Sequence, residues 1–414
     1  MKILLPAFGS AGDVHPVIGL GVGLRQRRHE VIIITNPYFK SLIEQAGLSF
    51  IGLGAVEDYQ AAIETPDLWH PQKGFEVIAR RAILPGLRLI YELIAGYDPA
   101  ETIIAASGLI FGARIAQEKL NFRLATLHLQ PVMLRSVYQA PVMAGLPLPD
   151  KLPPFIKKII FQAIDALVID RILAPETNAF RAELGLPPVK QLLGQWLHSP
   201  HRVIGLFPDW FAPPQPDWPA NTQLTGFILY DQASSASELA PEIARFLEAE
   251  EPPLIFTPGT AMQHGQQFFK ASIEASRLLG KRALLLTRHR AHLPEKLPPT
   301  VRHADYIPFS RVLPQAAALI HHGGIGTLAQ ALAAGIPQLV MPMSHDQPDN
   351  ARRLERLGVG LSLTPAHYRG PTVAGKLDQL LHSPHIQARC QTIAPKINFR
   401  EALVNTCVAI ENLG

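Results

Sequence analysis

The chain has 414 residues, of which 47% are hydrophobic and 17% charged, and its formal net charge is +4 at pH 7. This length corresponds to two or three domains, and so mild a positive charge argues against nucleic acid as a partner. Only two cysteines occur, which excludes a disulfide framework or a cysteine zinc site and is typical of the cytoplasm. The sequence shows neither a signal-peptide pattern nor a run of about 18 apolar residues. We expect a cytoplasmic protein and leave open peripheral contact with the inner face of a membrane.

The first 130 residues alternate between short apolar runs and helical segments. We predict strands at residues 2–8, 31–35, 48–53, 102–106 and 123–129, with helices at about 16–28, 39–46 and 109–120. This βαβ alternation predicts a parallel sheet, whose ligands bind outside the carboxyl ends of its strands.

Residues 130–200 lose this alternation and contain a long amphipathic stretch at residues 155–173. Its apolar side chains fall at helical spacing: Phe155, Ile156, Ile159, Ile160, Ala163, Ile164 and Leu167. We expect this face to pack into the protein core. The alternatives are a wall that binds a lipid and contact with a membrane surface.

A proline-rich stretch at residues 211–219 follows a predicted strand at 203–207 and is typical of a semi-rigid spacer. We predict a first domain at residues 1–211, a linker at 212–221, a second domain at 222–395 and a C-terminal helix at 396–414 that packs back on the first domain. The second domain repeats the alternation, with strands at 254–257, 283–286, 317–321 and 338–341 and helices at 266–279, 327–334 and 350–357. Two Rossmann-like α/β domains, with parallel sheets facing a central cleft, are the predicted fold.

A glycine-rich turn after the predicted strand 317–321 is the strongest chemical signal. It reads His321-His322-Gly323-Gly324-Ile325-Gly326-Thr327 and opens a helix. Glycines let backbone N–H groups approach an anion, and a helix N-terminus carries a partial positive charge. His322 and the Thr327 hydroxyl add hydrogen-bond donors, so the turn suits a phosphate. A tight turn with a capping threonine is the structural alternative.

Two neighbouring strand ends add polar groups to this turn. Asp346 and Gln347 follow the strand 338–341, and a carboxylate beside an amide suits the vicinal hydroxyls of a sugar, although such a pair is also common as a helix N-cap. Thr257, Gly259 and Thr260 follow the strand 254–257 and offer further backbone N–H groups to the same phosphates.

These motifs resemble the sugar-donor signature of family 1 nucleotide-sugar glycosyltransferases, which have the GT-B fold. The matching segments start at Tyr306-Ile307 and end at Asn350, and Tyr306 stands where the plant members have Trp. The resemblance implies that Tyr306 and the Ile307 backbone hold the base. It likewise implies that His322, Gly324, Gly326 and Thr327 hold the diphosphate, with Asp346 and Gln347 on the sugar hydroxyls.

The segment from Gly9 to Pro16 resembles the acceptor loop of the sterol and bacterial branch of that family. Transfer needs a general base for the acceptor hydroxyl, and the resemblance assigns this role to Asp13. A helix N-cap is the structural alternative for Asp13. His15, two positions later, is the second candidate as base or relay, although an isolated histidine near a loop is more often exposed or hydrogen-bonded.

The interior and proline-rich segments further resemble the B subunit of the rhamnosyltransferases of rhamnolipid synthesis. This resemblance implies an inverting, metal-independent hexosyltransferase that moves a sugar from a UDP- or dTDP-sugar to a hydroxyl of a hydrophobic acceptor. We expect no cofactor and no metal ligand cluster, because no Asp-x-Asp pair occurs and the histidines are scattered. A sugar-nucleotide 2-epimerase and a non-catalytic partner that binds sugar donor or lipid are the alternatives.

Overall fold

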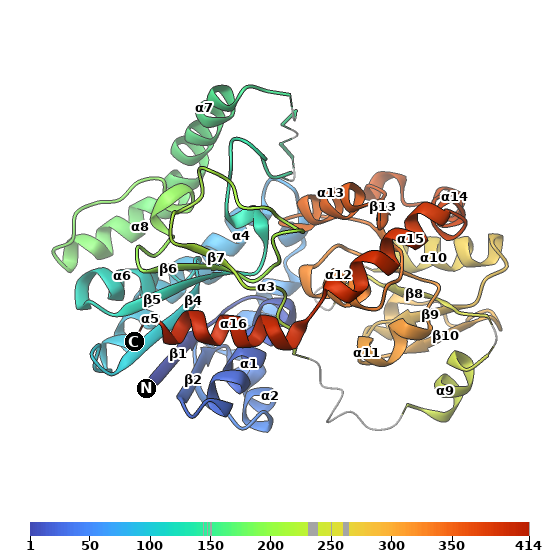
Figure 1. Cartoon of the computed structure of the whole chain (residues 1–414), viewed down its shortest axis with the longest axis horizontal. Coiled ribbons are helices and arrows are strands. Elements are labelled where there is room, and N and C mark those ends of the chain that lie inside the picture. Colours follow the sequence, from blue (N-terminus) through green and yellow to red (C-terminus); the bar gives the residue numbers. More distant parts are fainter. Residues whose placement is uncertain are drawn as a thin grey trace. The chain divides into compact units, whose positions relative to one another are not determined.

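The computed structural model describes residues 1–143, 145–146, 148–149, 151–230, 239–249, 251–259 and 265–413. It divides into two compact units, one formed by Met1–Tyr230 with Phe399–Gly414 and the other by Asp231–Asn398. Each unit has a parallel sheet covered by helices, which confirms the predicted two-domain α/β fold (Figure 1). Among the described residues, no helix is both long enough and apolar enough to span a bilayer.

The first unit is built on a seven-stranded parallel sheet in the order β3-β2-β1-β4-β5-β6-β7. Its strands are β1 (Lys2–Pro6), β2 (Glu30–Thr35), β3 (Ser49–Gly52), β4 (Thr102–Ser107), β5 (Arg123–His128), β6 (Arg202–Gly205) and β7 (Thr222–Leu224). Its helices are α1 (Ala11–Gln26), α2 (Lys40–Gln45), α3 (Val56–Glu64), α4 (Gly74–Ile78), α5 (Leu84–Ala95), α6 (Phe111–Leu120), α7 (Pro154–Ile164), α8 (Asp170–Glu183) and α16 (Phe399–Glu411). Leu4 packs into one core and Ile3 and Leu5 into the core on the other face, so β1 reads as a continuous apolar run.

The second unit has a six-stranded parallel sheet in the order β10-β9-β8-β11-β12-β13. Its strands are β8 (Leu254–Thr257), β9 (Ala283–Leu286), β10 (Val301–Ala304), β11 (Ala318–His321), β12 (Gln338–Val340) and β13 (Gly360–Ser362). Its helices are α9 (Pro241–Leu247), α10 (Gln266–Leu278), α11 (Phe309–Val312), α12 (Ile325–Ala333), α13 (Gln347–Leu357), α14 (Gly370–Leu381) and α15 (Pro384–Ile393). The carboxyl ends of β8, β11 and β12 are therefore neighbours.

The boundary between the units lies after Tyr230 and not in the proline-rich residues 212–221. Phe211 and Trp218 are buried, and Thr222–Leu224 pairs with β6 as the edge strand of the first sheet. A proline-rich segment serves equally well as a packed loop beside an edge strand, where missing N–H groups cost little.

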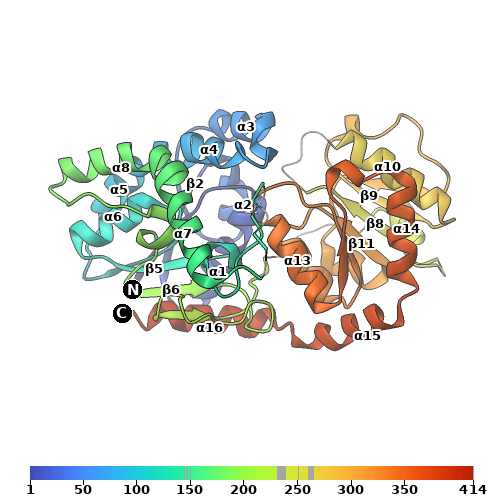
Figure 2. The same ribbon diagram turned by 90° about the horizontal axis from the view of Figure 1, so that it is seen from above.

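The C-terminal helix α16 lies against α1 within the first unit (Figure 2). Arg27 donates from Nε and Nη2 to the two carboxylate oxygens of Glu411, at 2.7 and 2.6 Å. In the same contact, the side chain of Leu403 packs against Gly23. A Cβ at Gly23 would lie only 2.9 Å from Leu403 Cδ1.

Two local predictions differ from the structure. Helix α1 begins at Ala11, five residues before the predicted start, because Ser10 and Asp13 form a capping box and Pro16 is accommodated inside the helix. The stretch at 155–173 is helical, as α7, a π-helical turn at Asp165–Ile169 and the start of α8. Its apolar face packs only in part, since Ile156, Ile160 and Ile164 are half-buried whereas Phe155, Ile159 and Leu167 are exposed.

Candidate functional site

Asp13 lies in the first turn of α1, just beyond the carboxyl end of β1. The backbone N–H and the hydroxyl of Ser10 donate to Asp13 Oδ2 at 2.8 and 3.1 Å, so Ser10 is the N-cap and Asp13 the third helical residue. Gly9 has a φ of +121°, and a Cβ at Gly9 would collide with the Asp13 carboxylate. The loop thus holds this carboxylate in one place.

Burial raises the pKa of Asp13 above its ordinary value, even though hydrogen bonds from Ser10 and Gln130 act in the opposite direction. A carboxylate with a raised pKa is a stronger base than an ordinary aspartate, as proton abstraction from a hydroxyl requires. Gln130 follows β5, and sequence reasoning missed it, although its place just beyond a predicted strand end was a usable signal.

His15 is half-buried and packs edge-on against the ring of Tyr230, with 6.0 Å between ring centres. Residues two apart on a helix do not share a face, so helix geometry alone does not bring His15 beside Asp13. The aromatic neighbour of His15 is thus Tyr230, the last residue of the first unit before the chain enters the second.

A pair of histidines that sequence reasoning missed lies at the carboxyl end of β5. His128 Nε2 lies 3.0 Å from His198 Nδ1. Burial lowers the pKa of His198 to about 4 and that of His128 well below its ordinary value, so both rings are neutral at pH 7. His128 lies one residue before the end of the predicted strand 123–129 and was detectable there, whereas no local pattern links it to His198, 70 residues away.

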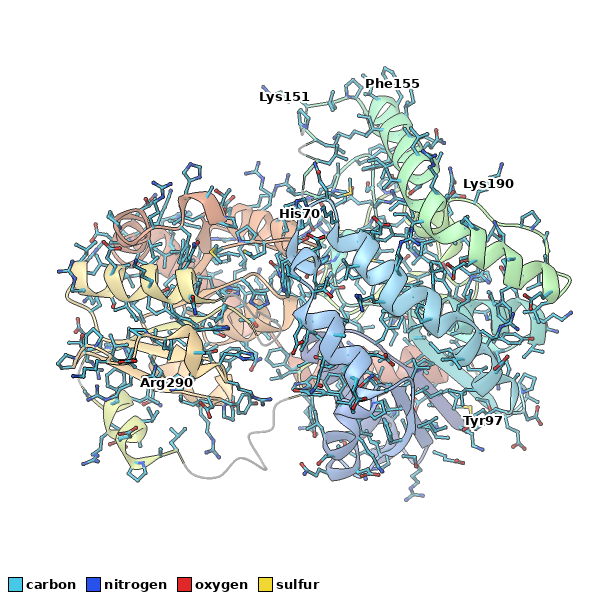
Figure 3. The ribbon with its side chains drawn as sticks, turned by 180° about the vertical axis from the view of Figure 1, so that it is seen from behind. His70, Tyr97, Lys151, Phe155, Lys190 and Arg290 are labelled. Carbon is cyan, nitrogen blue, oxygen red and sulfur yellow. The ribbon has the colours of Figure 1, made fainter. Side chains whose placement is uncertain are left out.

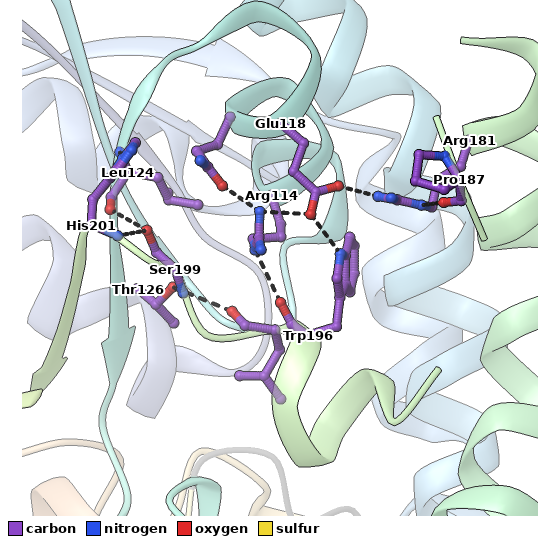
Figure 4. Close-up of polar contacts among 11 residues, drawn as sticks. Arg114, Glu118, Leu124, Thr126, Arg181, Pro187, Trp196, Ser199 and His201 are labelled. Carbon is purple, nitrogen blue, oxygen red and sulfur yellow. Dashed lines mark hydrogen bonds and ion pairs between the residues drawn. The ribbon is translucent and has the colours of Figure 1, made fainter. Parts of the chain in front are cut away.

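A polar network, buried in part, fixes the segment that carries His198 (Figure 4). Arg114 Nε donates to the Trp196 carbonyl at 3.0 Å, and the Trp196 indole donates to Glu118 at 3.0 Å. Glu118 is also paired with Arg181. On the other side, Ser199 donates from its N–H to the Thr126 hydroxyl at 2.9 Å and from its own hydroxyl to the Leu124 carbonyl at 2.7 Å.

In the second unit, His322 stands at the carboxyl end of β11, directly beside the end of β8. A Cβ at Gly259 or Gly324 would lie within 2.7 Å of the His322 ring, so only glycine admits the imidazole between these two backbones. His321 points elsewhere: its Nδ1 accepts from the Gly323 N–H at 3.1 Å and its Nε2 donates to Gln338 Oε1 at 3.0 Å. The two adjacent histidines thus differ in role.

Burial lowers the pKa of His322 to about 4, which keeps the ring neutral at pH 7. Its Nδ1 is buried and has no hydrogen-bond partner among the described residues. Gly323, with a φ of +98°, turns the chain into α12, whose N-cap is Gly324. Gly326 and Thr327 therefore belong to the first turn of α12, where free backbone N–H groups attract an anion.

The loop after β12 lies against this turn. Asn350 Nδ2 donates to the Gly323 carbonyl at 2.9 Å and to Asp346 Oδ2 at 2.7 Å, so it positions both the turn and the Asp346 carboxylate. Gln347 is only 3% exposed, and its Oε1 accepts from the N–H groups of Met343 and Ser344 at 2.8 and 3.4 Å. The amide oxygen of Gln347 is therefore engaged in holding its own loop.

The remaining predicted residues lie around the same sheet edge or outside the described part. Thr257 ends β8, and its hydroxyl accepts from the Gly259 N–H at 3.4 Å. Tyr306 follows β10 with 42% of its surface exposed and lies 5.7 Å from the Arg288 guanidinium, whereas Ile307 is buried. Thr260 lies outside the described residues.

Comparisons with known proteins agree with this arrangement. Residues 3–139 match the profile of the glycosyltransferase family 28 N-terminal domain. Residues 283–401 match the profile of the erythromycin biosynthesis protein CIII-like C-terminal domain. O-mycaminosyltylonolide 6-deoxyallosyltransferase of Streptomyces fradiae is 28% identical, over 99% of this chain and 97% of its own length.

Solved structures show the same fold. The glycotransferase of kitacinnamycin superposes with a TM-score of 0.74 at 20% identity, covering 100% of this chain and 98% of its own. The spinosyn rhamnosyltransferase SpnG complexed with thymidine diphosphate superposes with a TM-score of 0.68 at 18% identity, covering 98% and 99%. SpnG complexed with spinosyn aglycone has a TM-score of 0.68 at 19% identity, again covering 98% and 99%. The chain therefore has the GT-B fold of these glycosyltransferase structures.

Proposed function

We propose that the chain is a glycosyltransferase that moves a hexosyl group, with inversion, from a UDP- or dTDP-sugar to a hydroxyl of a hydrophobic acceptor, without a metal ion. The observation that carries the proposal is that each of the two units provides one chemical feature. One is a half-buried carboxylate with a raised pKa, Asp13, held at a strand end of the first unit. The other is a glycine-framed imidazole, His322, at a helix N-terminus of the second unit.

Asp13 is the proposed general base. Its carboxylate takes the proton from the acceptor hydroxyl as the hydroxyl oxygen attacks the anomeric carbon, and the bond from that carbon to the diphosphate breaks. Burial raises the pKa of Asp13, which brings it closer to the operating pH and makes the proton transfer more favourable. Attack opposite the leaving group inverts the anomeric centre.

The leaving diphosphate is the proposed partner of the α12 N-terminus. The first turn of α12 offers backbone N–H groups and a partial positive charge, and the neutral His322 ring adds one hydrogen-bond donor. Fixed donors aimed at developing charge are a large source of catalysis, because they need no reorganisation during the reaction. They also supply the charge compensation that a metal ion gives in other transferases.

Asp346 is the proposed contact for the sugar hydroxyls, because Asn350 holds its carboxylate beside the Gly323 turn. Gln347 would contribute through its amide nitrogen, since its Oε1 is already engaged with the backbone. We propose Tyr306 and the Ile307 backbone as the base-binding position.

The substrate classes are supported by the relatives. One was solved with thymidine diphosphate and with a spinosyn aglycone, and another is by name a 6-deoxyallosyltransferase acting on O-mycaminosyltylonolide. We propose the same two substrate classes, a nucleotide-sugar donor and a hydrophobic acceptor, for this chain. A close relationship to rhamnolipid rhamnosyltransferases and a cytoplasmic location stay predictions.

A transfer assay tests the proposal. The full chain is incubated with UDP- and dTDP-hexoses and a panel of hydrophobic hydroxyl acceptors, and products are identified by mass spectrometry and by the anomeric configuration in NMR. We expect a glycoside of inverted configuration that forms only with an acceptor present. Conversion of the sugar nucleotide itself without acceptor would identify an epimerase, and retention of configuration would contradict the mechanism.

A further inference from the structure

One face of α7 and of the π-helical turn that follows it is apolar and exposed. Phe155, Ile159 and Leu167 have exposed fractions of 65%, 60% and 64%. Together with the exposed Ala163 they recur every four residues and form one stripe along the helix. Of the eleven large apolar side chains that are exposed among the described residues, four fall within residues 155–168. This clustering differs from the scattered apolar side chains of an ordinary surface.

The opposite face attaches α7 to the first unit. Arg135 Nη2 donates to both oxygens of Asp165, at 2.7 and 2.8 Å, and the Arg135 guanidinium lies 5.5 Å from the centre of the Phe161 ring. Phe161 and Asp165 are buried, and so is Lys157 one turn earlier on the same face. The helix is therefore anchored through an ion pair and an aromatic ring, which leaves the apolar stripe outside the core.

Within residues 151–171, the exposed charged side chains are all cationic. Lys151, Lys158 and Arg171 are exposed. Of the nearby acids, Asp165 is buried in its ion pair, and Asp170 accepts from the backbone N–H groups of residues 191 and 192 at 2.7 and 3.1 Å. Phe155 stands at the N-terminal end of α7, and Lys151 lies on the loop that leads into it (Figure 3). The stripe thus has a rim of positive charge.

We propose that this face of α7 docks the protein on the surface of an anionic lipid bilayer. Apolar side chains on one side of a helix enter the boundary between headgroups and acyl chains, while lysines beside them contact anionic headgroups. A second copy of the chain fits less well, because a two-fold contact through this stripe would bring the lysines of both copies together. The docking goes beyond the proposed transfer reaction and needs neither sugar donor nor acceptor.

Co-sedimentation of the full chain with vesicles tests the docking. One set of vesicles is phosphatidylcholine alone, and the other contains about one-third phosphatidylglycerol. We expect strong binding to the anionic vesicles and weak binding to the neutral ones. Replacing Ile159→Ser together with Leu167→Ser should weaken binding about tenfold or more. Replacing Lys151→Glu together with Lys158→Glu should weaken binding to the anionic vesicles about fivefold or more.

Matched controls come from α10 of the second unit. Leu278→Ser removes an apolar side chain of similar exposure, and Lys270→Glu reverses an exposed lysine, so both variants should bind as the unaltered chain does. The proposal is overturned if the unaltered chain does not sediment with anionic vesicles, or if the α7 variants bind equally well. It is also overturned if ultracentrifugation shows a dimer that Ile159→Ser with Leu167→Ser dissociates. No outcome depends on glycosyl transfer.

Discussion

Burial acts in opposite directions on the two titratable side chains that carry the proposed chemistry. It raises the pKa of Asp13, and it lowers the pKa of His322 to about 4, because in each case the charged form loses solvation. Asp13 thereby becomes a better proton acceptor. His322 stays neutral at pH 7 and serves as a hydrogen-bond donor of fixed orientation rather than as a cation.

The pH dependence of turnover should report the Asp13 carboxyl. A base works only when deprotonated, so turnover should fall as the pH decreases through the pKa of Asp13. The ordinary pKa of an aspartate is 3.8, and that of Asp13 is raised. The acidic limb of the profile should therefore appear at a pH above 3.8. The measurement is kcat against pH at saturating sugar donor. A profile flat down to about pH 4 would contradict a raised pKa in the base.

His322→Ala should weaken binding of the nucleoside diphosphate. The change removes a hydrogen bond to a charged group, which costs about 1.5–3 kcal/mol, or about 10- to 150-fold in affinity. Isothermal titration with UDP and dTDP measures it. His382→Ala, at an exposed histidine just after α14, is the matched control and should bind normally. Unchanged affinity in His322→Ala would remove this side chain from the site.

At the residue scale, the sequence predicted where the candidate site residues lie better than it predicted which contacts their side chains make. Asp13 and His322 each follow a buried strand. Because the carboxyl ends of parallel strands lie at the same edge of a sheet, the sequence predicted where these two residues lie. The engagement of Gln347 Oε1 with its own loop was not, because it depends on the backbone path between β12 and α13. The His128–His198 contact joins residues far apart in the chain, which no local pattern encodes.

At the scale of elements, α1 carries the proposed base at one end and is tied to α16 at the other. Glu411 accepts from Arg27 at 2.7 and 2.6 Å and lies 2.7 Å from His29 Nε2. The hydrogen bond with Arg27 is the main reason that the pKa of Glu411 falls from 4.5 to about 2. The basic run at residues 25–28, typical of a solvated helix end, therefore provides a specific anchor for the C-terminal helix.

Glu411→Gln should lower the thermal stability of the first unit at pH 7. Ion pairs at partly exposed positions contribute about 0.2–1 kcal/mol, which corresponds to a shift of at most about 2–4 °C in the unfolding midpoint. A depressed carboxyl pKa stabilises the fold above pH 4.5 and loses this effect as the pH falls towards 2. The difference between the two proteins should therefore shrink in acid.

Scanning calorimetry at several pH values measures this loss, with Glu57→Gln as the control because Glu57 is exposed on α3 of the same unit. Equal midpoints for Glu411→Gln and the unaltered chain at pH 7 would show that α16 is held by apolar packing alone.

Element boundaries were harder to predict than elements. Pro16 suggested a helix start, yet the capping box of Ser10 and Asp13 starts α1 earlier. The strands β7, β10 and β13 were missed because each lies at the edge of its sheet, is only partly buried and lacks the continuous apolar run of the central strands. Helix α7 was predicted with its apolar face inward, since apolar spacing shows a face and not its neighbour.

At the scale of the whole molecule, the proposed base and the proposed diphosphate site belong to different units of the chain. The alternation of strands and helices predicted both units, because parallel sheets need crossover helices. The unit boundary was not predicted, since Phe211 and Trp218 anchor the proline-rich loop in the first unit through burial that proline content does not reveal.

Transfer should persist in excess EDTA. The N-terminus of α12 and His322 are proposed to meet the charge of the leaving diphosphate, so no step requires a divalent ion. The initial rate is measured after chelation and again after adding magnesium or manganese. Loss of activity that either ion restores would show that the leaving group is stabilised differently.

The central claim is that Asp13 deprotonates the acceptor, and single-turnover kinetics of Asp13→Asn test it most directly. The amide keeps the shape that the Ser10 bonds require, and sugar-donor affinity should stay near normal because the diphosphate site lies in the other unit. We predict a rate of transfer about 10²–10⁴-fold lower than that of the unaltered chain, with His15→Ala affected less. An active Asp13→Asn together with an inactive His15→Ala would contradict the claim, move the base to His15 and leave Asp13 as a residue of the capping box.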